Sequence, residues 1–149
     1  MLAQTLNSLF TRDLKRLKAE IESYRKESNL WLVEPDISNS AGNLCLHLIG
    51  NLNTYIGATL GGTNYVRNRP LEFSAKNIPQ KRLITMIEET IIVVEQTLDK
   101  INQETIEAEY PLPVFDERTS TEFFLVHLTT HLSYHLGQIN YHRRLLDLI

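Results

Sequence analysis

The residues best suited to chemistry in this sequence are its histidines. The chain has five, and four of them, His127, His131, His135 and His142, fall within one short segment near the C-terminus. On an α-helix, which turns about 100° per residue, these four positions lie within a stripe about 80° wide. Side chains four residues apart stand one turn above each other, so His131 and His135 can bind one metal ion together. The pair His127 and His131 offers the same geometry one turn earlier, and the spacing alone leaves both pairs open.

A third nitrogen ligand has to come from another helix, and the sequence offers one further histidine, His47, beside the apolar residues Leu44 and Leu48. Three neutral imidazoles leave at least one coordination position of a divalent ion open, which is typical of catalytic rather than structural sites. An ion in such a site lowers the pKa of a bound water or thiol. Zinc suits three imidazoles best, and nickel, iron, manganese and cobalt are the alternatives.

The same histidines have a plainer interpretation. A single histidine that faces a core is usually a hydrogen-bonded residue, and a His-x-x-x-His pair on a helix also arises by chance. Burial would then oblige each ring nitrogen to find a polar partner. His127 and His142 are expected to line a pocket, to support the ligands or to fill polar positions at a bundle end, rather than to bind the ion.

Four helices are predicted to position these side chains. Apolar residues recur at helical spacing over about residues 2–28, 40–60, 79–101 and 119–149. Ser38 and Ser40 are alternative N-caps of the second helix, and a capping box from Thr119 to Glu122 begins the fourth. The connection over residues 63–78 is long enough to cross a bundle, so the second and third helices can lie parallel. We therefore predict an all-α four-helix bundle that forms a single domain over residues 1–149.

Several segments resemble a known family. The run LCLHLIGNLNTYIGATLGG, the segment YVRNRPLEFS and the run HLTTHLSYHLGQINYHRRLL are similar to the DinB-like (YfiT-like) superfamily, and the similarity covers essentially the whole chain. Its most specific element is the pattern His-x-x-x-His-x-Gly-Gln. The resemblance implies an up-down-down-up bundle with a metal ion held by three histidines in its core. Transferred position by position, the ligands are His47, His131 and His135, and Gly137-Gln138 favours the pair that ends at His135.

The resemblance also implies a function. Some relatives are transferases or isomerases that use a low-molecular-weight thiol such as bacillithiol, mycothiol or glutathione, others have no established activity, and members are often homodimers. We therefore expect a homodimeric metal-dependent hydrolase or transferase that activates water or a thiol and acts on a small molecule. The alternative is a non-catalytic dimeric bundle whose pocket is vestigial or binds a small ligand. Many relatives carry a basic residue where this chain has Leu136, which argues against an anion contact there.

Other residues are expected to act around the histidines. Asn51, Tyr134 and Gln138 are candidates to orient a ligand or contact the substrate. Residues 65–69 contribute Tyr65, Arg67 and Arg69, which suit a lid that binds an anionic thiol. The single cysteine, Cys45, projects about 200° away from His47 on a helix and is expected to be a small buried residue.

Composition excludes several classes of protein. The chain has 149 residues, one cysteine and a net charge of -3. One cysteine rules out a disulfide framework and a cysteine-based zinc site. The balanced charge argues against a nucleic-acid partner. No apolar run approaches the roughly 18 residues that cross a membrane, and the N-terminus lacks the pattern of a signal peptide. We therefore expect a cytoplasmic protein with neither nucleic acid nor membrane as partner.

Overall fold

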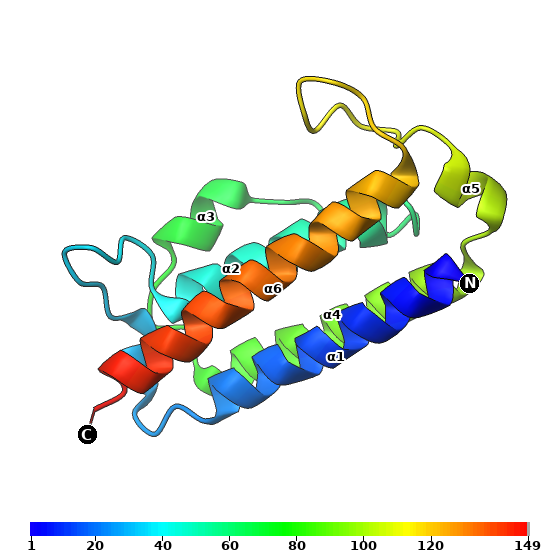
Figure 1. The fold of residues 1–149 in the computed structure, drawn as a ribbon. Coiled ribbons are helices and arrows are strands. Elements are labelled where there is room, and N and C mark those ends of the chain that lie inside the picture. Colours follow the sequence, from blue (N-terminus) through cyan, green and yellow to red (C-terminus); the bar gives the residue numbers. More distant parts are fainter. Residues whose placement is uncertain (149) are drawn as a thin grey trace.

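The structure, a computed structural model that describes residues 1–148, is built around four long helices (Figure 1). These are α1 (Leu2–Glu22), α2 (Ala41–Leu52), α4 (Gln80–Lys100) and α6 (Thr121–Leu146). The shorter elements are the 3-10 helix η1 (Glu27–Trp31), the π-helical turn η2 (Asn53–Ala58), α3 (Arg69–Ser74) and α5 (Gln103–Glu107). Helices α1 and α6 run in one direction and α2 and α4 in the other (Figure 1). The predicted up-down-down-up, all-α bundle is therefore confirmed.

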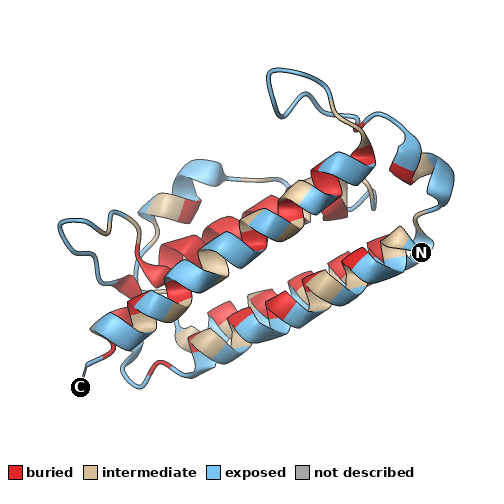
Figure 2. Ribbon diagram, in the orientation of Figure 1, coloured by how far each residue is buried: buried red, intermediate tan, exposed pale blue. Residues whose placement is uncertain are grey.

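The core lies where the four helices face one another. Helix α1 packs against α4 and α6, and α2 packs against the same two helices. The buried side of α1 carries Leu6, Phe10, Leu14 and Leu17 at steps of three and four residues, and Figure 2 shows the buried positions turned toward the neighbouring helices. All residues of α2 are buried, because α3 covers the side that α4 and α6 leave open. His47 therefore lies in the most enclosed helix of the bundle.

Two predicted helix boundaries need correction. Helix α1 ends at Glu22 and not near residue 28, because the backbone N–H groups of Arg25 and Lys26 donate to the Asp147 carboxylate at 2.8 and 3.3 Å. The predicted capping box of α6 is wrong by one residue. Ser120 is the N-cap and accepts from the backbone N–H of Phe123 at 3.1 Å, so no carboxylate stands at the third helical position.

The predicted start of the second helix holds, but its α-helical part ends at Leu52 and the chain continues to Ala58 as the π-helical turn η2. Ser40, and not Ser38, caps α2 by accepting from the N–H of Asn43 at 3.2 Å. Gly62 follows η2 with a φ of 68°, a left-handed conformation that glycine adopts without strain. The predicted long connection contains the short helix α3, capped by Asn68. Within residues 1–148, none of the helices combines the length and apolar character that crossing a lipid bilayer requires.

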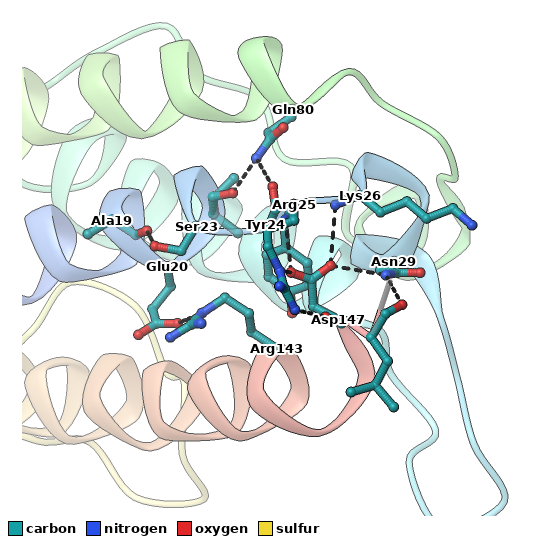
Figure 3. A network of polar contacts seen from close by, with 12 residues as sticks. Ala19, Glu20, Ser23, Tyr24, Arg25, Lys26, Asn29, Gln80, Arg143 and Asp147 are labelled. Atoms are coloured by element: carbon teal, nitrogen blue, oxygen red, sulfur yellow. Dashed lines mark hydrogen bonds and ion pairs between the residues drawn. The ribbon is translucent and has the colours of Figure 1, made fainter.

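A polar network closes the end of the bundle where α1 and α6 meet (Figure 3). Asp147 is buried and accepts from Asn29 Nδ2 at 3.0 Å as well as from the backbone after α1. His142 is buried beside this network. Its Nε2 lies 2.9 Å from the Leu32 carbonyl oxygen and its Nδ1 lies 2.7 Å from the Tyr24 hydroxyl. Since a carbonyl only accepts, His142 donates from Nε2 and accepts at Nδ1, which is a neutral tautomer.

The position of His142 predicts a pH dependence of stability. Burial lowers the pKa of His142 below its ordinary value of about 6.5, despite the carbonyl contact that raises it. The unfolded chain therefore takes up a proton at this residue before the folded chain does. Its contribution to stability is complete above about pH 6.5 and declines as the pH falls below that value. We expect the free energy of unfolding of His142→Gln to change less between pH 7 and pH 5 than that of the wild type, as measured by urea denaturation. Parallel pH profiles of the two proteins would contradict this.

Candidate metal centre

The structure brings the three predicted ligands together. His47 extends from α2, and His131 and His135 extend from consecutive turns of α6. One ring nitrogen of each lies within 4.8 Å of the others, and the Nε2 atoms of His47 and His131 are 3.2 Å apart. Two imidazole nitrogens on a tetrahedral zinc ion, each at 2.0–2.1 Å from the metal, are about 3.4 Å apart. His47 and His131 therefore match the spacing that a metal ion requires, and His135 completes the three-histidine cluster (His47, His131, His135) within 4.8 Å.

Two of the three rings are held by a side chain on the nitrogen that faces away from the cluster. His47 Nδ1 lies 3.1 Å from Glu72 Oε1, and His135 Nδ1 lies 2.7 Å from Gln138 Oε1. A carboxylate or amide oxygen accepts, so in both cases Nδ1 carries the proton. The Nε2 lone pairs of His47 and His135 are then free for a cation, and the outer contacts fix the ring orientations.

Glu72 reaches His47 through an unusually close approach of α3 to α2. A Cβ atom placed on Gly50, one turn after His47, would lie 1.9 Å from Glu72 Oε2. Only glycine leaves room for the carboxylate here. Arg67 binds the same carboxylate with two nitrogens, Nε at 2.8 Å from Oε2 and Nη2 at 3.0 Å from Oε1. The buried charge of Glu72 is thus compensated by a two-pronged ion pair.

The contacts of Arg67 bear on the expectation that it binds an anionic thiol. Arg67 lies beside the cluster, with Nη2 3.4 Å from His47 Nδ1, but its charge is already paired with Glu72. It therefore supports His47 and is not a free binding group for an anionic thiol. Arg69 is exposed at the start of α3, and Tyr65 is partly exposed. Of the three residues predicted to bind an anion, Arg67 is thus already paired with Glu72.

The electrostatic surroundings keep two rings of the cluster neutral. Burial, together with the neighbouring His135 and His47, lowers the pKa of His131 to about 4. Burial also lowers the pKa of His47, although its hydrogen bond to Glu72 opposes the shift. Neutral imidazole is the form that binds a metal ion, so both side chains are ready to act as ligands at neutral pH.

The remaining predicted residues lie in different places. His127 packs against aromatic rings and His142 belongs to the bundle end, so both lie outside the cluster, as predicted. Gln138 contacts His135 as predicted, and the Tyr134 ring, although 66% exposed, lies edge-on to the His135 ring at 5.4 Å between centroids. Asn51 is buried, and its Oδ1 has no hydrogen-bond partner within residues 1–148. Cys45 is buried and apolar in its surroundings, as expected.

Sequence reasoning missed the carboxylate beside His47. Glu72 lies 25 positions after that histidine, in a segment without sustained periodicity. A local signal was present: Asn68 followed by Pro70 is a helix start, which places Glu72 in a first turn. That signal predicts the short helix but not the face of the bundle against which it packs.

Comparison with known proteins places this architecture. The chain matches, over residues 3–147, the model of a family described as protein of unknown function (DUF1572). It belongs to that family. DUF1572 is a DinB-like family, so the resemblance found in the histidine-bearing segments is confirmed. A comparison with curated proteins gives no match.

A solved structure supports the fold of this DUF1572 protein. It is described as the crystal structure of the conserved protein of locus from Enterococcus faecalis. The two chains superpose with a TM-score of 0.76 over 96% of this chain and 95% of that one, at 16% sequence identity. At that identity the likeness establishes the shared fold and leaves the chemistry to be argued from the residues of this chain.

Proposed function

We propose that this protein is a metal-dependent hydrolase or transferase that binds one divalent ion, zinc fitting best, at His47, His131 and His135. The observation that carries the proposal is the 3.2 Å approach of two Nε2 atoms within a cluster whose outer nitrogens are held by Glu72 and Gln138. A bound ion supplies Lewis-acid activation of a water or a low-molecular-weight thiol at its open position. The substrate is a small molecule.

Three side chains around the proposed metal site hold the ligands in place. Glu72 and Gln138 fix two imidazole rings, and Arg67 keeps the Glu72 carboxylate in place. All three ligands are neutral, so the ion retains its full positive charge toward the group that it activates. His131 and His135 are half-buried, which leaves a path from solvent to the cluster on the α6 side.

The direct test is the metal content of the protein. Untagged protein is purified without chelator, and its metals are measured by plasma mass spectrometry before and after incubation with zinc or nickel followed by desalting. About one ion per chain supports the proposal. No retained ion after either incubation contradicts it and favours the non-catalytic bundle with a vestigial or ligand-binding pocket.

A second measurement separates the two nucleophiles. Cobalt(II) replaces zinc in such sites and absorbs strongly in the near ultraviolet when a thiolate binds it. Adding 2-mercaptoethanol to the cobalt-loaded protein is expected to produce that absorption if the enzyme uses a thiol. An unchanged spectrum would assign the protein to the water-activating class.

Gln138 provides a test of the outer contacts. We expect Gln138→Leu to weaken zinc binding about 10- to 100-fold, because the His135 ring loses the acceptor that fixes its tautomer and orientation. The zinc affinity is measured by competition with a chromophoric chelator. Gln103→Leu, on the short helix α5 far from the cluster in sequence, is the control and should bind zinc as the wild type does. If Gln138→Leu and Gln103→Leu bind zinc with equal affinity, Gln138 does not contribute to the site.

The outer face of α6 supports the homodimer that we also propose. Phe123, Val126, Tyr134 and Tyr141 are 56%, 42%, 66% and 62% exposed and follow one another along a single side of the helix. A Cβ on Gly137 would touch nothing within 4 Å, so a second backbone can approach there. A two-fold axis near Gly137 would set Tyr134 of one chain beside Tyr141 of the other.

Light scattering after gel filtration tests this arrangement. The wild type should have twice the mass of the 17.2 kDa chain, and Tyr134→Glu should have the mass of one chain. Ile92→Glu changes an exposed apolar residue of α4 and should leave the mass unchanged. A monomeric wild type, or a dimer that Tyr134→Glu leaves intact, would contradict the interface.

A further inference from the structure

A groove with no assigned role opens directly beside the three-histidine cluster. It lies between residues 36–39, which precede α2, and the C-terminal half of α6, and its volume is about 320 Å³. His135 and Gln138 both line it, so the groove and the cluster share a candidate ligand and that ligand's hydrogen-bond partner. A molecule lying in this groove would reach the face of the cluster on the His135 side.

The walls of the groove are mainly apolar. Ile37 and Leu44 line one side, and Tyr141 and Leu145 line the other. His142 also contributes to the wall, but both of its nitrogens are occupied, by the Tyr24 hydroxyl and the Leu32 carbonyl. A molecule bound in the groove would therefore contact the carbon atoms of the His142 ring and would not form a hydrogen bond with it.

The polar groups of the groove carry no positive charge. None of the lining residues is lysine or arginine, and the one ionised side chain is Asp36, which is exposed. Gln138 uses its amide oxygen for His135, and its NH2 group has no hydrogen-bond partner within residues 1–148. Gln138 therefore supplies the groove with a hydrogen-bond donor beside His135, and Asp36 supplies it with a negative charge.

We infer that this groove binds the apolar, uncharged part of the substrate and presents a carbonyl-type acceptor to Gln138, next to His135. The inference rests on the proposed function, which it extends to a substrate class. Away from the metal position at His135, a carboxylate or phosphate in the groove would lose its hydration without gaining a cationic side chain as partner and would share the groove with Asp36. The volume lies at the lower end of the range for small-molecule sites, about 300–1,000 Å³, so a small molecule built on one aromatic ring fits within it.

Two probes of equal shape test the charge preference. Benzamide is neutral and offers a carbonyl oxygen, whereas benzoate carries a negative charge on the same frame. Binding of each is followed by chemical-shift changes in ¹H–¹⁵N spectra of the metal-free protein, so that direct coordination of benzoate to a metal cannot contribute. Benzamide is expected to bind at least tenfold more tightly than benzoate. Equal affinities, or tighter binding of benzoate, would overturn the inference.

Variants locate the binding. Ser38→Trp places a bulky group on the exposed rim of the groove and should weaken benzamide binding at least tenfold, while Ser28→Trp adds the same group outside the groove and should not. Asp36→Asn should improve benzoate binding without changing that of benzamide. If Ser38→Trp binds benzamide as the wild type does, the groove is not its site.

The metal measurement keeps this inference separate from the proposed function. A protein that holds a metal ion but does not bind benzamide overturns the inference alone. A protein that retains no metal, yet binds benzamide in a manner sensitive to Ser38→Trp, overturns the proposed enzyme and supports the groove as a binding site for neutral small molecules.

Discussion

Glu72→Ala is expected to lower the free energy of unfolding by about 3–5 kcal/mol and to weaken zinc binding about 10- to 100-fold. Glu72 is 6% exposed, and the Arg67 side chain that binds it is also largely buried. Removing the carboxylate leaves the guanidinium without its counter-charge in a poorly solvated position, and it leaves His47 Nδ1 without an acceptor. The protein loses stability because the Arg67 charge stays buried without a partner. It loses zinc affinity because the His47 ring is no longer held by an acceptor.

These two effects can be measured separately. Urea denaturation of the metal-free protein reports the stability loss, and competition with a chelator reports the zinc affinity. The control is Glu89→Ala, because Glu89 is exposed and only distantly paired with Arg82, at 3.9 Å. We expect that control to change stability by less than about 1 kcal/mol.

A double variant tests the stated cause. If the unpaired Arg67 guanidinium causes the loss of stability, the double variant Arg67→Met/Glu72→Ala should be more stable than Glu72→Ala alone, since no buried charge is left unpaired. The zinc affinity should stay low in the double variant, because His47 still lacks its acceptor. A double variant that is less stable than both single variants would show that packing, rather than charge, dominates at this position.

The bundle could be predicted from local periodicity, whereas the choice of His47, His131 and His135 among the histidines depended on the family resemblance. Helix α4 shows the spacing of an apolar face over its whole length, and α6 sets His131 and His135 one turn apart whatever lies around them. The end of α1 could not be predicted in this way. It depends on Asp147, which is distant in sequence and draws the backbone of Arg25 and Lys26 out of the helix.

The contacts around the candidate ligands show the same difference between what local sequence predicts and what depends on packing. Gln138 stands three residues after His135 on one helix, so its proximity could be predicted from the sequence. Glu72 depends on how α3 docks on α2, and that docking depends on Gly50, whose role appears only when the two helices are seen together. A resemblance to a family supplies the ligand positions, but the charge balance around them is particular to this chain.

His131→Ala is expected to abolish stoichiometric zinc binding while the bundle stays folded. The two remaining ligands would come from different helices, and the chelating pair on α6, in which one helix holds two nitrogens a turn apart, would be lost. The fold should survive because the buried apolar faces of α1, α2, α4 and α6 carry its stability, and His131 is only half-buried. Replacing it also removes a ring whose Nδ1 is buried without a hydrogen-bond partner within residues 1–148, so the loss of stability should be small.

The matched control for this variant is His127→Ala, one turn earlier on α6. His127 is also half-buried and packs against Phe115 and Phe124, and although its ring stacks on that of His131 it is not one of the three candidate ligands, so its variant should retain about one ion per chain. Metal content is measured by plasma mass spectrometry and the fold by circular dichroism. Loss of metal in both variants would indicate that α6 as a whole, and not the predicted pair, holds the ion. Loss of helical signal in His131→Ala alone would mean that this histidine belongs to the core. The histidines of α6 would then be interpreted as hydrogen-bonded core residues and not as metal ligands.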